Sequence, residues 1–334
     1  MGLWYNEPMN TTNWPLVGQA NAIAYLERLL AFERQQPRTL GGCYVFSGEA
    51  SVGKTTALGY FLSRLGGETI DLQETSAADI VRLERADERR EIGVAQAREF
   101  SGRLALSSFA GRYRIGIIFE AEALSLEAAN ALLKTLEDAR EQVLIFLLVS
   151  SPDRLPATIM SRSQRVSFCP VPSDTLYEWL IAEKGLSRPQ AKNLSRLANG
   201  RPGLALRLAD DKKLLEDRLA PARIFCDSLR LTLAERWQAV AKLLGSATGA
   251  ENAAKAASIL NSWRLLVRDL LLMRLNKPEL VTHAFLEQEL REAGKRLTLA
   301  ELRRYDKSLS DAQSYLTANV SPKLVLEQAI MNIS

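Results

Sequence analysis

Histidine and cysteine are scarce in this chain, and their scarcity excludes several kinds of chemistry. His283 is the only histidine among 334 residues, which argues against a His-based catalytic triad and against a His-rich metal site. The three cysteines, Cys43, Cys169 and Cys226, are far apart and form no C-x-x-C pair. We therefore expect each cysteine to be a small residue of the core, and we expect no zinc site. Any chemistry must rest on lysine, arginine, carboxylates and hydroxyls.

Long apolar runs are also missing. The longest, Val143 to Val149, is far below the roughly 20 residues that a membrane span needs. The first residues do not show the basic and then apolar order of an export signal. We therefore expect a cytoplasmic protein with no membrane contact. The net charge of +4 permits contact with nucleic acid without arguing for it.

The composition that is present, 47% hydrophobic and 25% charged, predicts a large core and two or three domains. In the first half, short apolar runs alternate with amphipathic segments, which is typical of a parallel sheet covered by helices. The strand candidates are Cys43–Ser47, Ile115–Phe119, Val143–Ser150 and Arg165–Cys169. The helix candidates are Ala22–Phe32, Thr55–Leu65, Val94–Leu106 and Leu126–Leu136. The charged stretch Leu83–Glu91 is interpreted as a solvated helix face or loop.

The pattern changes near Pro170, after which every segment is predicted to be helical. Ser187 is a candidate N-cap and Gly200 a candidate helix end, which outlines a small helical subdomain. The predicted organisation is an α/β P-loop domain at 1–170, a helical subdomain at 171–209 and a second all-α domain at 210–334. Trp263 and Leu266 belong to an apolar helix face that we interpret as packed rather than as a DNA contact.

A phosphate-binding motif follows the first strand candidate. The segment from Gly48 to Thr55 fits G-x-x-x-x-G-K-[ST] at every fixed position and lies between a strand and a helix, the context that the motif requires. Its glycines let the backbone wrap around phosphate oxygens, Lys54 would neutralise phosphate charge, and Thr55 would offer its hydroxyl to Mg²⁺. ATP and Mg²⁺ are the predicted ligands. The binding residues are Gly48, Glu49, Ala50, Ser51, Val52, Gly53, Lys54, Thr55 and Thr56.

The second strand candidate, Ile115–Phe119, is followed by acidic residues, as in P-loop ATPases, where an acidic pair holds Mg²⁺ and orients the attacking water. Phe119 stands at the first position of this pair and cannot bind a metal ion. Glu120 stands at the second and is the candidate catalytic carboxylate, while Glu122 would substitute if the strand end were shifted. We therefore expect hydrolysis to be impaired more than binding.

Three further segments resemble one family in combination. They are Ala128–Glu137, Ser150–Leu155 and Thr158–Arg165. Together with Asn319–Glu327 they closely resemble AAA+ subunits of the bacterial DNA polymerase III clamp loader, and among these the delta-prime subunits. The resemblance implies a AAA+ core, a helical lid and a helical collar. The chain departs from the family by lacking the four closely spaced zinc-binding cysteines of many delta-prime subunits, and it retains the lysine that several have lost.

The resemblance also implies roles for single residues. Arg162 in Ser161-Arg162-Ser163 would reach the nucleotide of a neighbouring subunit as a trans arginine finger, although an ordinary ion pair is the alternative. Ser151, or Ser150 beside it, would be the polar sensor. Gly203 falls where motor subunits place an arginine against their own nucleotide. Val17 belongs to the segment Trp14–Gln19 that would border the adenine.

The implied assembly is a pentameric ring with delta and tau/gamma-like subunits. It would load a sliding clamp onto primed DNA, and this chain would have weak or no ATPase activity and no polymerase site of its own. Two alternatives remain. One is a hydrolysing motor subunit or another AAA+ ATPase that acts on DNA, against which Phe119 and Gly203 argue. The other is a scaffold with a vestigial P-loop.

Overall fold

The computed structural model describes residues 14–66, 70, 72, 79–86, 91–106, 113–138, 142–246 and 249–333. The chain divides into two compact units. The first comprises Met1–Trp179 and Gly200–Leu204, and the second comprises Leu180–Asn199 and Ala205–Ser334. Each unit is described by itself below.

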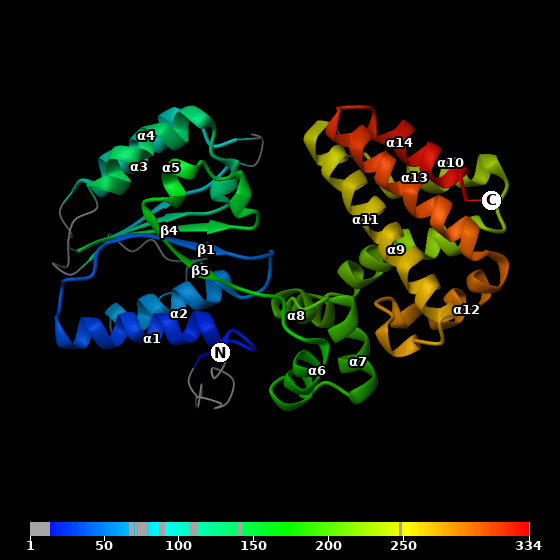
Figure 1. Cartoon of the computed structure of the whole chain (residues 1–334), viewed down its shortest axis with the longest axis horizontal. Helices are drawn as coiled ribbons and strands as arrows, with labels where there is room; N and C mark the ends of the chain where they lie inside the picture. Colours follow the sequence, from blue (N-terminus) through cyan, green and yellow to red (C-terminus); the bar gives the residue numbers. More distant parts are fainter. Residues whose placement is uncertain are drawn as a thin grey trace, which may run out of the picture. The chain divides into compact units, whose positions relative to one another are not determined.

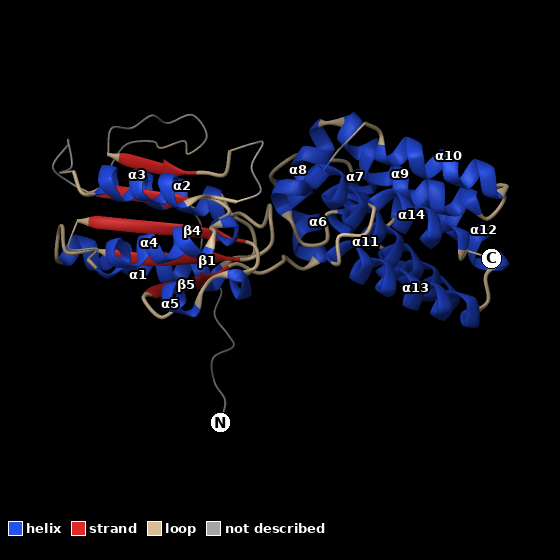
Figure 2. Ribbon diagram, turned by 90° about the horizontal axis from the view of Figure 1, so that it is seen from above, coloured by secondary structure: helices blue, strands red, loops and turns tan. Residues whose placement is uncertain are grey.

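The first unit is built on a parallel sheet of five strands (Figures 1 and 2). In chain order they are β1 (Gly42–Ser47), β2 (Ile80–Leu83), β3 (Arg114–Ile118), β4 (Val143–Val149) and β5 (Ser163–Ser167). Their order across the sheet is β2-β3-β4-β1-β5, and every pairing is parallel. This arrangement confirms the predicted fold class. Strand β2 was not among the predicted strands.

Strand β1 lies inside the sheet, where it pairs with β4 from Gly42↔Leu144 onward and with β5 on its other edge. Helices cover both faces of the sheet, which explains the near-continuous apolar sequence of β1. Phe146 of β4 stacks on Tyr44 at 5.4 Å between ring centroids and meets Phe46 edge-on at 5.6 Å. Such aromatic pairs add roughly 1 kcal/mol beyond their burial.

Helices cover both faces of the sheet in Figure 1. One face carries α1 (Ala20–Gln35) and α2 (Lys54–Gly66), and the other carries α3 (Val94–Leu104), α4 (Leu126–Glu137) and the short α5 (Ala157–Met160). The start of α4 is set by Ser125, whose Oγ accepts a hydrogen bond from the N–H of Ala128 at 3.1 Å. Such a cap satisfies one of the four amide groups left open at a helix start.

After β5 the described residues form helices and no strand. They are α6 (Ser173–Ala182), α7 (Arg188–Leu197), α8 (Pro202–Asp210), α9 (Lys212–Ser228), α10 (Leu233–Leu244), α11 (Gly249–Arg274), α12 (Glu287–Arg296), α13 (Leu299–Thr317) and α14 (Pro322–Met331). Ser187 forms a capping box with Gln190, as the sequence predicts for an N-cap. Within the described ranges, no helix is both long and apolar enough to cross a lipid bilayer.

Helix α11 organises the core of the second unit. Trp263 is fully buried, and its indole N–H donates to the carbonyl of Pro221 at 2.8 Å. Asp269, also fully buried, accepts the backbone N–H groups of Thr282 and His283 at 3.0 and 2.9 Å and meets Nδ1 of His283 at 2.8 Å. These contacts confirm the interpretation of a packed helix and give the single histidine a structural place.

The cysteines follow the predicted pattern at two of three positions. Cys43 and Cys226 are buried, and burial raises the pKa of each thiol to about 12, which makes both poor nucleophiles. Cys169 is exposed, so the prediction of a core residue is wrong there. Its backbone N–H and carbonyl both bond the side chain of Gln19, which holds the chain beyond β5 while the thiol stays at the surface.

Candidate nucleotide-binding site

The phosphate-binding motif lies where the sequence predicts it, between β1 and α2. Helix α2 begins at Lys54, so the amide groups of its first turn face the loop. Ser51 and Gly53 have positive φ angles of 67° and 110°, which turn the backbone sharply before the helix. A helix start preceded by such a turn favours an anion, because unpaired N–H groups and the helix dipole point the same way.

Gly48 is required at its position by both conformation and space. Its φ is +153°, and a Cβ built on it would lie 2.3 Å from the carbonyl oxygen of Phe168. No larger residue fits without moving the segment after β5. The loop therefore starts from a rigid point, since the N–H of Gly48 also donates to the carbonyl of Val149 at 3.1 Å.

Lys54 is held inside the loop. Its side chain is buried, and the ammonium donates to the carbonyls of Gly48 and of Glu49, the latter at 2.9 Å. Burial lowers the pKa of Lys54, while the charges of Glu122 and Glu49 oppose that shift. A buried cation bonded to neutral carbonyls is poised to bond phosphate oxygens, which are stronger acceptors.

The segment Trp14–Gln19 packs against the loop. A Cβ on Gly53 would lie 2.8 Å from Cδ2 of Leu16, and Val17 is buried. Gln19 is buried as well, and its amide donates to the carbonyl of Val52 at 3.3 Å and to that of Cys169 at 2.7 Å. Sequence reasoning gave Gln19 no role of its own. Its side chain joins the phosphate-binding loop to the end of β5.

The acidic residues after β3 are arranged differently from the sequence expectation. Phe119 packs against the core, and the guanidinium of Arg82 lies 5.0 Å from its ring centroid. Glu120 has a left-handed φ of 47° and is exposed, and its carboxylate meets Nε of Arg85 at 3.0 Å. The candidate catalytic carboxylate is therefore engaged by an arginine that follows β2.

Glu122 was predicted only as a substitute for Glu120, and the structure places it beside the end of β4. The 3-10 helix η1 (Ala121–Ala123) carries it, and its Oε1 accepts the N–H of Ser150 at 2.9 Å. Ser150 and Ser151, the sensor candidates, follow β4 and are exposed. Because β4 lies between β3 and β1, this contact brings Glu122 toward the phosphate-binding loop.

Arg162 lies at the surface just before β5. Its Nε meets Oε1 of Glu137 at 2.6 Å, and its Nη1 donates to the carbonyl of Thr158 at 3.0 Å. The side chain is 36% exposed, so its guanidinium is partly open to solvent. An exposed ion pair of this kind stabilises a protein by at most about 1 kcal/mol. The pair is therefore weak enough to exchange for a stronger acceptor.

Gly203, at the start of α8, contacts the phosphate-binding loop directly. Its N–H donates to the carbonyl of Ser51 at 3.0 Å, and a Cβ built on it would lie 3.2 Å from the same oxygen. Arg201, two residues earlier, has Nε 4.0 Å from Oε2 of Glu49. The carbonyl of Ser51 thus occupies space that an arginine side chain at position 203 would need.

We expect the variant Gly203→Arg to be less stable than the wild type by about 1–2 kcal/mol, because overpacking forces the neighbouring backbone to move. Chemical denaturation measures this difference. Gly102→Arg is the matched control, since a Cβ at Gly102 meets nothing within 4 Å. Equal stability of the two variants would contradict the close contact with Ser51.

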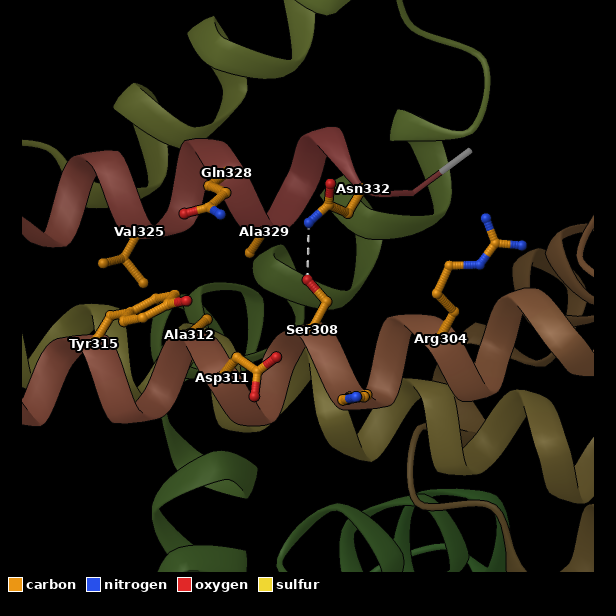
Figure 3. Close-up of a pocket in the computed structure, with 10 residues that line it drawn as sticks. Arg304, Ser308, Asp311, Ala312, Tyr315, Val325, Gln328, Ala329 and Asn332 are labelled. Atoms are coloured by element: carbon orange, nitrogen blue, oxygen red, sulfur yellow. Dashed lines mark hydrogen bonds between the residues drawn. The ribbon is translucent and has the colours of Figure 1, made fainter.

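The second unit contains a separate hollow between α13 and α14 (Figure 3). It has a volume of about 270 Å³. Arg304 and Lys307 bring positive charge to it and Asp311 negative charge, while Nδ2 of Asn332 donates to Oγ of Ser308 at 2.9 Å. No predicted site residue falls in this hollow, and none of the motifs in the sequence explains it.

The five-stranded parallel sheet and the loop around Lys54 have the architecture of a AAA+ P-loop fold. Residues 19–172, less than half of the chain, match the family model described as "DNA polymerase III, delta subunit". This part of the chain is therefore similar to DNA polymerase III subunits.

Individual relatives agree. DNA polymerase III subunit tau of Bacillus subtilis is 29% identical over 174 residues, which are 48% of this chain and 30% of that protein. Subunit delta' of Escherichia coli is 32% identical over 137 residues, 41% of each chain. The matches thus span less than half the length of these relatives. The crystal structure of a DNA polymerase III gamma subunit-related protein from Thermotoga maritima aligns with a TM-score of 0.55 and 18% identity, covering 92% of this chain and 98% of that one. The last comparison supports the fold alone.

Proposed function

We propose that this chain is a delta-prime-like subunit of a bacterial DNA polymerase III clamp loader, which binds ATP and supports ATP-dependent loading of a sliding clamp onto primed DNA. One observation carries the proposal. The phosphate-binding loop is complete, while the carboxylate expected to drive hydrolysis, Glu120, is paired with Arg85. Such a site is suited to bind a nucleotide and poorly equipped to cleave it alone.

ATP binding rests on the loop itself. The amides at the start of α2 and the ammonium of Lys54 would hold the phosphates, and Val17 would border the adenine. Thr55, in the first turn of α2, would offer its hydroxyl to Mg²⁺. When bound, Mg²⁺ neutralises phosphate charge. Phe119 contributes no ligand to the ion.

Arg162 would act on a neighbouring subunit. Its partial exposure and its weak pairing with Glu137 leave it able to engage phosphate oxygens of a nucleotide bound elsewhere in the ring. A guanidinium is permanently charged and bonds such oxygens in two places, which a lysine does not do. Ser151 would serve as the sensor of the chain's own nucleotide.

The remaining helices would form the lid, at 171–209, and the collar, at 210–334. Apolar side chains exposed on or beside α13 and α14 support an interface there, because exposed apolar groups mark contact surfaces. They are Tyr315, Val320, Leu324 and Met331. The partners would be delta and tau/gamma-like subunits in a pentameric ring, together with the clamp and DNA in the cytoplasm.

Co-purification from the native host tests this proposal. We expect a tagged copy of the chain to retain tau/gamma-like and delta subunits through gel filtration, and the bound nucleotide to be ATP or ADP. Mass spectrometry identifies the proteins, and chromatography of an acid extract identifies the nucleotide. Recovery of the tagged chain as a monomer, with neither subunit present, would overturn the assignment.

A scaffold with a vestigial P-loop is the second candidate. The observation in its favour is that the ammonium of Lys54 bonds the loop's own carbonyls, those of Gly48 and Glu49, so the loop is internally satisfied. The two candidates differ in one measurable property, the affinity for ATP.

A further inference from the structure

Two carboxylates that follow β3 are directed toward opposite edges of the sheet. Glu120 pairs with Arg85, which follows β2 on the outer side of β3. Glu122 instead accepts the N–H of Ser150, which follows β4 on the side of β1. The phosphate-binding loop follows β1. Glu122 is therefore directed toward the strand that carries the phosphate-binding loop, and Glu120 is directed away from it.

Among the described residues, the second oxygen of Glu122 accepts no hydrogen bond. This oxygen, Oε2, is buried, whereas Oε1 accepts the N–H of Ser150. Leaving a buried polar atom without a hydrogen bond destabilises a protein, and more so when the atom is charged. A carboxylate oxygen in this state fits a cation or a water bound to one, because Mg²⁺ prefers oxygen ligands and keeps several waters.

The position next to it is unable to supply that ligand. Phe119 stands where an aspartate would be expected, packs against the core and lies beside Arg82. We propose that Glu122 is the carboxylate that couples Mg²⁺ to nucleotide at this phosphate-binding loop, in place of an aspartate at position 119. This inference rests on the proposed binding of ATP. The carboxylate that supports the metal ion would then lie three residues later than expected, at position 122 in η1 instead of position 119 after β3.

Nucleotide binding with and without metal tests the inference. A fluorescent ATP analogue is titrated into the full chain in excess Mg²⁺ and in EDTA, and the ratio of the two affinities measures the coupling. We expect Glu122→Gln, which keeps the shape of the side chain, to reduce this ratio about 10-fold, as losses of metal-supporting ligands do. Affinity in EDTA should stay at the wild-type value.

Glu127→Gln is the matched control, because Glu127 is an exposed carboxylate on the neighbouring helix α4, and its coupling should equal that of the wild type. An unchanged ratio in Glu122→Gln would overturn the inference while leaving ATP binding intact. Equal losses with and without Mg²⁺ would show a purely structural role through Ser150 and would also overturn it. The inference would also be wrong if Glu120→Gln lost the coupling between Mg²⁺ and nucleotide while Glu122→Gln kept it. Absence of binding by the wild type would overturn the ATP proposal together with this inference.

Discussion

Replacing Arg162 by alanine should slow ATP hydrolysis at the adjoining subunit of the reconstituted loader by on the order of 10³-fold. The guanidinium would stabilise the negative charge that develops on the transferred phosphoryl group, and alanine has no positive charge to do so. Single-turnover quench-flow with the complete assembly measures the effect. The fast phase of ATP hydrolysis should lose the amplitude that corresponds to one site per assembly, because the variant alters only the interface between this chain and its neighbour.

Two controls separate this role from the ion pair seen in the structure. Arg154→Ala removes another exposed arginine from the same region and should leave the fast phase unchanged. Glu137→Gln removes the charged partner of Arg162 but keeps the guanidinium, so hydrolysis should persist. If Arg162→Ala and Glu137→Gln had the same effect, the pair itself would be what matters, and the trans role would be wrong.

The elements that sequence reasoning predicted are those whose signal is local. The strands β1, β3 and β4 are apolar runs, and the loop at Gly48–Thr55 has fixed spacing, so each is recognisable from its own residues. Strand β5, Ser163–Ser167, is mostly polar and begins before the predicted strand Arg165–Cys169. Strand β2 was missed because it has only four residues, Ile80–Leu83, and charged residues follow it directly. Its pairing with β3 is a tertiary interaction that no short pattern reports.

The acidic part of the site was harder to predict for a geometric reason. The alternation rule assumes that a strand continues, but β3 ends at Ile118, and Glu120 turns the chain with a left-handed φ before η1 begins. That turn decides which carboxylate lies beside β4. The role of Gln19 was invisible for a related reason, since its partners are backbone atoms 33 and 150 residues away.

The contact of Gly203 with Ser51 shows the opposite case. The family resemblance implies that motor subunits have an arginine at this position, and the structure shows what surrounds the glycine here. The N–H of Gly203 donates to the carbonyl of Ser51 in the loop, and a Cβ at 203 would lie 3.2 Å from the same oxygen. A motif comparison indicates such a difference in sequence but does not show which contacts surround the position.

Lys54→Ala should weaken ATP binding about 100-fold. A hydrogen bond to a charged group is worth roughly 1.5–3 kcal/mol, and each 1.4 kcal/mol corresponds to a factor of ten in affinity. Isothermal titration calorimetry on the full chain measures the change. Lys134→Ala is the control, because it removes an exposed lysine from α4 and should bind ATP as the wild type does.

The same variant distinguishes a working P-loop from a vestigial one, because Lys54 also bonds the carbonyls of Gly48 and Glu49. Without nucleotide, a change in thermal stability reports only those internal bonds. ATP that binds only the folded state raises the melting temperature by an amount that grows with the logarithm of its affinity. We expect the wild type to gain stability from ATP and Lys54→Ala to gain almost none. If ATP stabilised neither protein, the lysine would be serving the loop alone, and the chain would act as a scaffold.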